Sequence, residues 1–144
     1  MRQLLKFLIL LSTGGAIYAI FEILFRGRTH WSMFLVGGIC FVLIGGLNNW
    51  FSWEMSIFRQ MLISAVIVTA VEFISGIILN IWLGWNVWDY SNMTLNILGQ
   101  ICLPFTVLWF FLSFIAIVVD DFLRWRWFGE RFPEYHLFSR EGTP

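Results

Sequence analysis

A single carboxylate, Glu72, lies near the centre of an apolar stretch, AVIVTAVEFISGIILNIW, that is long enough to cross a membrane. An isolated carboxylate at this depth is costly unless it is protonated, hydrogen-bonded or in contact with water. Small and polar residues recur on its helix face at steps of three or four: Ala65, Thr69, Gly76 and Asn80. Such a face is expected to pack on other helices. Glu72 is therefore either the centre of a transport, ligand or proton site, or a hydrogen-bonded structural clasp.

A second acidic residue, Glu22, lies late in the first apolar segment, in a stripe of the same spacing that also holds Gly15, Tyr18 and Arg26. Arg26 follows Glu22 by one helical turn, so an i,i+4 ion pair could neutralise the acid locally. Glu22 is thus either part of a rim salt bridge and helix-packing contact, or a second member of the polar site.

Possible partners for Glu72 lie in the fourth apolar segment, where Asn96 and Gln100 are one turn apart and share a helix face. Pro104 is expected to interrupt this segment, because proline frees a backbone carbonyl that needs another partner in a membrane. A kink at this position is therefore predicted, and kinks sometimes line cavities.

The loop GWNVWDYSN, before the fourth segment, is the most distinctive non-helical piece of the chain. Its Asp89 and Tyr90 either cap the next helix and anchor the loop at the interface, or shape a mouth for a solute or lipid.

The elements that must position these residues follow from the composition. The 144 residues are 59% hydrophobic and only 12% charged, about half the charge of a soluble domain. This indicates an all-α, polytopic membrane helix bundle in one compact domain, residues 1–119. Four segments are long and apolar enough to span a bilayer, and they cover approximately residues 4–25, 33–51, 58–83 and 94–119.

The C-terminal part, residues 120–144, mixes arginines with aromatic residues in DDFLRWRWFGERFPEYHLF. This pattern predicts a short amphipathic helix that lies on the cytoplasmic surface of the bilayer. It serves either as a plain anchor or as a docking surface for a cytoplasmic partner. The similar placement of Glu22 and Glu72 also suggests a two-fold internal repeat of a two-span unit.

Orientation follows from the basic residues that flank the spans. One side holds seven of them, Arg2, Lys6, Arg59, Arg124, Arg126, Arg131 and Arg140. The other side holds Arg26 and Arg28. Both termini are therefore predicted to be cytoplasmic. Aromatic residues at the expected span ends support the same map: Trp31, Trp50, Trp53, Trp82, Trp85, Trp88, Tyr90, Trp125 and Trp127.

Several classes of protein are disfavoured. The net charge of zero provides no basic surface for nucleic acid. Cys40 and Cys102 lie in apolar runs and define no disulfide framework, and the two histidines have no second ligand at helical spacing, so neither a metal nor a cofactor is expected. An enzyme is the least favoured class, because no nucleophile motif is present. The chain has no GxxxxGK[ST] pattern, so any ATPase must be a separate chain.

The motifs together resemble the putative ABC-transporter type IV family of bacterial membrane proteins. The likeness covers most of residues 13–113 and rests on elements that recur in order: Glu22, Arg26-Gly27, His30, Glu72, Gly76, Asn80, Trp88-Asp89-Tyr90-Ser91, Asn96 and Gly99-Gln100. The resemblance implies a multi-pass protein of the bacterial cytoplasmic membrane that acts as a permease-like subunit, with a separate ATPase and a homodimer or larger assembly as partners.

The leading hypothesis is therefore a membrane transport component with a polar site around Glu72. Its candidate ligand- or ion-binding residues are Glu22, Arg26, His30, Glu72, Asn80, Asp89, Tyr90, Asn96 and Gln100. One alternative is a proton-coupled small carrier that acts as a homo-oligomer. Another is a membrane protein that binds a ligand or lipid without transporting it.

Overall fold

The computed structural model describes residues 1–50 and 55–137, without the side chains of residues 48 and 49. Three features named above lie outside the described residues: the end of the second expected span at Phe51, the aromatic residue Trp53 and the basic residue Arg140. The described residues confirm the all-α fold, because they form helices and no strand.

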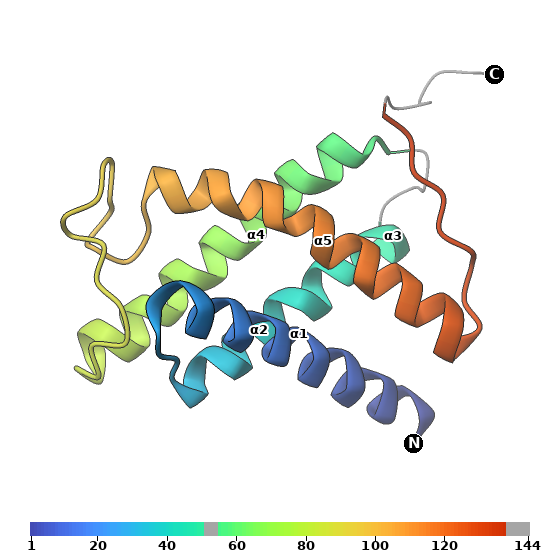
Figure 1. The fold of residues 1–144 in the computed structure, drawn as a ribbon, viewed down its shortest axis with the longest axis horizontal. Coiled ribbons are helices and arrows are strands. Elements are labelled where there is room, and N and C mark those ends of the chain that lie inside the picture. The colour runs from blue at the N-terminus through green and yellow to red at the C-terminus, as the bar shows by residue number, and fades with distance from the viewer. Residues whose placement is uncertain (51–54, 138–144) are drawn as a thin grey trace.

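The chain forms two long helical hairpins, shown in Figure 1. α1 (Arg2–Arg26) and α2 (Trp31–Gly45) make the first, and α3 (Leu47–Trp50) is a short continuation of it. α4 (Ile57–Gly76) runs directly into the π-helix η1 (Ile77–Trp82), and α5 (Leu103–Phe128) completes the second hairpin. In this view α1 and α5 lie in front of α2 and α4, and both described ends of the chain lie at the end of the bundle opposite the loop between η1 and α5.

Three helical stretches are long and apolar enough to cross a membrane: Arg2–Arg26, Ile57–Trp82 and Leu103–Phe128. α2 is apolar but shorter, at 15 residues. Backbone bonds carry the helical path onward past Gly45, because Gly46 N donates to Val42 O (3.0 Å) and Trp50 N donates to Gly46 O (3.0 Å). At about 1.5 Å per residue, α2 and α3 together reach approximately 30 Å, the thickness of a bilayer core.

The expected start of the fourth span is wrong. α5 begins at Leu103 and not near Thr94, and Pro104 lies in its first turn, where a proline has no hydrogen bond to break. Pro104 therefore starts the helix and does not kink it. Residues 83–102 form an irregular loop, held by backbone bonds such as that from Tyr90 N to Gly99 O (2.7 Å).

The prediction of a separate amphipathic helix after Val119 is also wrong for the described part of residues 120–144, which ends at residue 137. α5 passes through residues 120–128 without a break, and it ends where Gly129 adopts a left-handed φ of 67°. Residues 129–137 are not helical. They fold back against the bundle, where the Tyr135 hydroxyl donates to the Asp121 carboxylate (2.9 Å) and Ile57 N donates to His136 O (2.7 Å).

Glycines allow the first hairpin to pack closely. A Cβ at Gly14 or Gly37 would overlap the side chains of Phe41 and Tyr18, respectively. These glycines of α1 and α2 therefore permit near contact between the two helix backbones, as predicted for small residues in membrane helices. Gly45 plays the same role against α5, where an added Cβ would overlap the Asp120 carboxylate.

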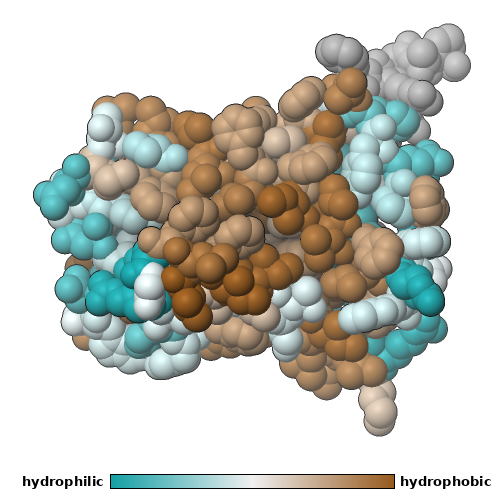
Figure 2. All heavy atoms as spheres, in the orientation of Figure 1, coloured by the Kyte–Doolittle hydropathy of each residue, from teal (hydrophilic) through white to brown (hydrophobic). Residues whose placement is uncertain are grey.

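The surface is apolar in its middle. Figure 2 shows hydrophobic residues across the centre of the face formed by α1 and α5, with hydrophilic residues gathered at the loop end and at the end that holds the termini. This banding is what a bilayer requires of a bundle whose helices run from one surface to the other.

Candidate functional site

Glu72 is buried in the bundle, with 5% of its surface exposed, and two neutral donors hold its carboxylate. The Tyr90 hydroxyl donates to one oxygen (2.7 Å), and the indole Nε1–H of Trp109 donates to the other (2.9 Å). Glu72 makes no ion pair with any residue that the structure describes. Each oxygen of the buried carboxylate therefore accepts a hydrogen bond, and no described residue forms an ion pair with it.

The inward face predicted for α4 is confirmed. Ala65 and Gly76 are buried with Glu72, and the Thr69 hydroxyl meets that of Thr106 at 3.0 Å. Gly76 is needed for close approach, because an added Cβ would lie 2.5 Å from Oε1 of Gln100.

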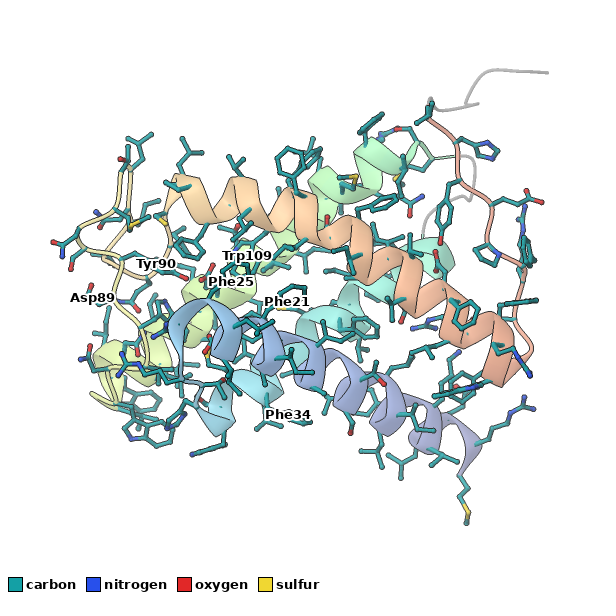
Figure 3. All side chains as sticks on the ribbon, viewed as in Figure 1. Phe21, Phe25, Phe34, Asp89, Tyr90 and Trp109 are labelled. Carbon is teal, nitrogen blue, oxygen red and sulfur yellow. The ribbon has the colours of Figure 1, made fainter. Side chains whose placement is uncertain are left out.

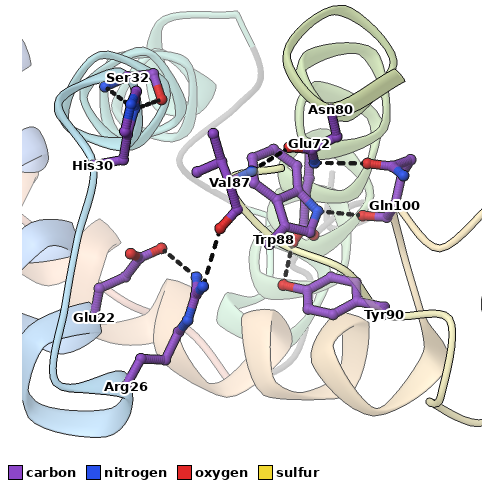
Figure 4. A network of polar contacts seen from close by, with 10 residues as sticks. All are labelled: Glu22, Arg26, His30, Ser32, Glu72, Asn80, Val87, Trp88, Tyr90 and Gln100. Atoms are coloured by element: carbon purple, nitrogen blue, oxygen red, sulfur yellow. Dashed lines mark hydrogen bonds and ion pairs between the residues drawn. The ribbon is translucent and has the colours of Figure 1, made fainter. Parts of the chain in front are cut away.

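Asn80 fixes the loop that delivers Tyr90 to Glu72. In the π-helical turn, its side chain accepts from Val87 N (2.6 Å) and donates to Gln100 Oε1 (2.8 Å). The Trp88 indole then donates to Gln100 O (3.0 Å), as Figure 4 shows. Asn80 in η1 thereby holds the loop near both of its ends, at Val87 and at Gln100. Short π-helical segments are frequent at functional sites.

Asn96 and Gln100 do not share a helix face, which corrects the expectation above. Both lie in the loop, since α5 starts only at Leu103. The Asn96 amide donates to Met93 O (3.0 Å), and its oxygen accepts from Gly99 N (3.1 Å), so it stabilises the loop itself. Gln100 supports the site indirectly, through Asn80.

The predicted pair between Glu22 and Arg26 is confirmed, with 3.4 Å between Nη1 and Oε1. Arg26 also reaches the loop, because its Nη2 donates to Val87 O (3.0 Å). Glu22 itself is 7% exposed. One arginine therefore joins the end of α1 to the same loop that Asn80 holds from η1 (Figure 4).

Two candidate residues have local structural contacts. His30 caps α2, where its Nδ1 accepts from Ser32 N (3.2 Å), and its ring lies against Trp31 and Trp85. Asp89 is exposed and accepts from Ser91 N (2.9 Å) and from the Ser91 hydroxyl. These two donors lower the pKa of Asp89 below its usual value. Neither His30 nor Asp89 lines the cavity described next.

A cavity of about 320 Å³ lies between α1, α2, α4 and α5 and brings Glu22, Arg26, Glu72 and Tyr90 together. Its other lining residues are largely apolar. They include residues of α1 (Ile17, Tyr18, Phe21, Phe25), α2 (Met33, Val36, Phe41), α4 (Val68) and α5 (Phe105, Leu108, Trp109, Leu112, Ile115). In Figure 3, Phe21 and Phe25 of α1 lie near Trp109 of α5. The arrangement can hold a small, mainly apolar molecule against a few polar groups.

Sequence reasoning missed Trp109, which contacts Glu72 from the second turn of α5. Its ring lies against those of Tyr18 (5.9 Å) and Phe105 (6.1 Å between ring centroids), both in tilted arrangements. Its place inside the expected fourth span, residues 94–119, is the signal that could have found it, because membrane tryptophans otherwise gather at the interfaces.

A second polar cluster, also missed, lies at the end of the bundle that holds the termini. Asp120 is fully buried and pairs with Arg124 (2.7 Å), while Glu130 pairs with Lys6 and lies 3.8 Å from Arg124. The cluster joins α1, α5 and the C-terminal segment. Burial, and after it the neighbouring carboxylate of Asp121, raises the pKa of Tyr135, which lies at the same end. Within the described residues, no group of three potential ligands is placed to hold a metal ion.

Long apolar helices, an apolar central band and polar groups turned inward define a multi-pass helical membrane protein. The family model of the putative ABC-transporter type IV family matches residues 6–131, and the chain belongs to this family. This confirms the resemblance seen in the sequence and makes the chain a membrane transport component. Comparison with curated proteins and comparison with solved structures gave no match.

Proposed function

We propose that the protein is a permease-like subunit whose solute or coupling ion is bound at Glu72, in the cavity between the helices. One observation carries the proposal. A buried carboxylate faces a cavity, is held by Tyr90 and Trp109, and has no ion-pair partner among the described residues. Intramembrane acids of this kind commonly mark ion or substrate sites. Glu22, Arg26, Asn80 and Gln100 support this site, and a separate ATPase supplies the energy. The protein is not itself an enzyme.

The proposed setting is the bacterial cytoplasmic membrane, with both termini in the cytoplasm. The excess of basic residues at the end of the bundle that holds the termini supports this orientation. A four-helix bundle leaves little room for a complete pathway, so the subunit is proposed to work as a homodimer or in a larger assembly.

The test is purification of the tagged protein from its native membrane in a gentle detergent, with mass spectrometry of whatever accompanies it. A stoichiometric ATPase is expected. ATP hydrolysis by the purified complex should then change in Glu72→Gln and not in Glu134→Gln, a matched control on the exposed C-terminal segment. Unchanged hydrolysis in Glu72→Gln, at normal expression, would exclude a coupling role for Glu72.

A second candidate is a proton-coupled carrier that acts as a homo-oligomer without an ATPase. It is supported by the same two hydrogen bonds to Glu72. Because Tyr90 and Trp109 are neutral donors, Glu72 can exchange a proton without breaking an ion pair. A homo-oligomer free of ATPase, with flux driven by a pH gradient, would favour this candidate. Ligand binding without flux would instead favour a non-transport role.

A further inference from the structure

The cavity is open on the face formed by α1 and α5. The two helices pack mainly on their own hairpin partners, and the cavity lies between them. Its rim residues are exposed, with Phe25 at 77% and Ile115 at 44% of their surface. Figure 2 shows that this face is largely hydrophobic across its centre. In a membrane this opening faces lipid tails, so a molecule dissolved in the bilayer has direct access.

The walls and the floor of the cavity differ in chemistry. The walls are aromatic and aliphatic, with Phe21 and Phe25 stacked on one side and Leu108 and Leu112 on the other. The floor carries the Glu72 carboxylate. A volume of about 320 Å³ is at the lower end of the range for ligand sites, roughly 300–1,000 Å³. It fits one alkyl chain or a compact ring system better than a whole two-chain lipid.

The charges on the cavity wall do not balance. Glu22 and Arg26 offset each other as an i,i+4 pair, and the remaining titratable or weakly acidic groups on the lining are Tyr18, Cys40 and Tyr90. Glu72 is therefore the one formal charge among the described lining residues that has no opposite partner. A cation at the floor would supply what the protein lacks, whereas an anion would meet an unscreened carboxylate.

We propose that the cleft between α1 and α5 binds a cationic amphiphile that enters sideways from the bilayer. Its apolar part lies between Phe21, Phe25 and Leu112, and its positive charge is at Glu72. This inference names the ligand class of the site proposed above and rests on that proposal. Charge complementarity selects this occupant over a neutral lipid tail or a helix of a second copy.

The test measures binding of radiolabelled dodecyltrimethylammonium to the full-length protein in phosphatidylcholine nanodiscs, after subtraction of partitioning into empty discs. We expect saturable binding at one site. Dodecanol and dodecanoate, which have the same chain length, should compete at least tenfold more weakly when their concentrations in the bilayer are matched. Equal competition by all three would overturn the proposal, as would the lack of a saturable component.

Three variants locate the site. Glu72→Gln should weaken binding at least tenfold, because it removes the charge and keeps the side-chain size. Leu112→Trp should do the same by filling the cleft, whereas Leu62→Trp, on an exposed part of α4 outside the lining, should bind as the wild type does. Ile115→Trp, at the rim, replaces Leu112→Trp if that variant does not fold. Wild-type affinity in both Glu72→Gln and the cleft-filling variant would refute the assignment.

The two proposals fail separately. Saturable cation binding without an ATPase partner or flux would leave the ligand class standing and remove the permease function. An active transport complex without amphiphile binding would keep the permease function and remove the proposed ligand class. A disulfide between copies of Ile115→Cys in native membranes would show that a second copy covers the cleft, which also overturns the inference.

Discussion

Removal of one hydroxyl tests the central contact of the site. In Tyr90→Phe the Glu72 carboxylate loses its 2.7 Å hydrogen bond, while the ring can keep its stacking on Phe105, at 4.7 Å between ring centroids. Hydrogen bonds to charged groups contribute about 1.5–3 kcal/mol in soluble proteins. Those between membrane helices average about 0.6 kcal/mol, with a maximum of about 1.7. Because the Glu72 carboxyl group is buried and accepts this bond at 2.7 Å, we expect the coupling free energy between the two residues to be about 1–2 kcal/mol.

The assay is a double-mutant cycle of unfolding free energies in mixed micelles, with Tyr90→Phe, Glu72→Met and the double variant. Methionine is chosen because the amide oxygen of a glutamine could still accept from Tyr90. Tyr135→Phe is the matched control. It also removes a bonded tyrosine hydroxyl, but at the opposite end of the bundle, so its effect should add to that of Glu72→Met within about 0.3–0.5 kcal/mol. A coupling free energy between Tyr90 and Glu72 no larger than that of the control would refute the claim that their hydrogen bond stabilises the protein.

Three further predictions concern other parts of the structure. Gly45→Ala should destabilise the protein by about 1–3 kcal/mol in the same unfolding assay, because the added methyl overlaps the buried Asp120 carboxylate; wild-type stability would contradict the close packing of α2 on α5. Glu130→Gln should speed cleavage of residues 129–137 in limited proteolysis, since Glu130 ties this segment to Lys6 and Arg124, whereas Glu134→Gln should not. An equal effect of the two would show that the cluster does not hold the segment. The hydrogen bonds from Ser91 to Asp89 should persist above the ordinary carboxyl pKa of 3.8 and be lost as the pH falls through the lowered pKa of Asp89, since the ionised form is the one that Ser91 stabilises. Hydrogen exchange at the Ser91 amide checks this, and Asp89→Asn should abolish the pH dependence.

The sequence by itself determined the class of fold. Apolar runs of about 20 residues in a membrane commonly form helices, because their backbone groups must bond within the segment. This placed the first and third expected spans within a few residues of the helices that form. It also determined local pairs such as Glu22 with Arg26, because a four-residue step on a helix fixes proximity. Small residues around Glu72 marked its face as an inward one for the same reason. The internal repeat stays a prediction.

Tertiary structure alone decided what surrounds Glu72. Asn96 and Gln100 were expected as partners because the fourth helix was placed nine residues too early, and a proline in the first turn looks the same in sequence as a proline that breaks a helix. The actual donors, Tyr90 and Trp109, come from a loop and from another helix. Contacts between segments distant in the chain depend on how the loops and the close packing orient the helices relative to one another. The spacing of residues within one segment carries no information about that orientation. The cavity that opens between α1 and α5 also results from this packing of helices that are distant in the chain.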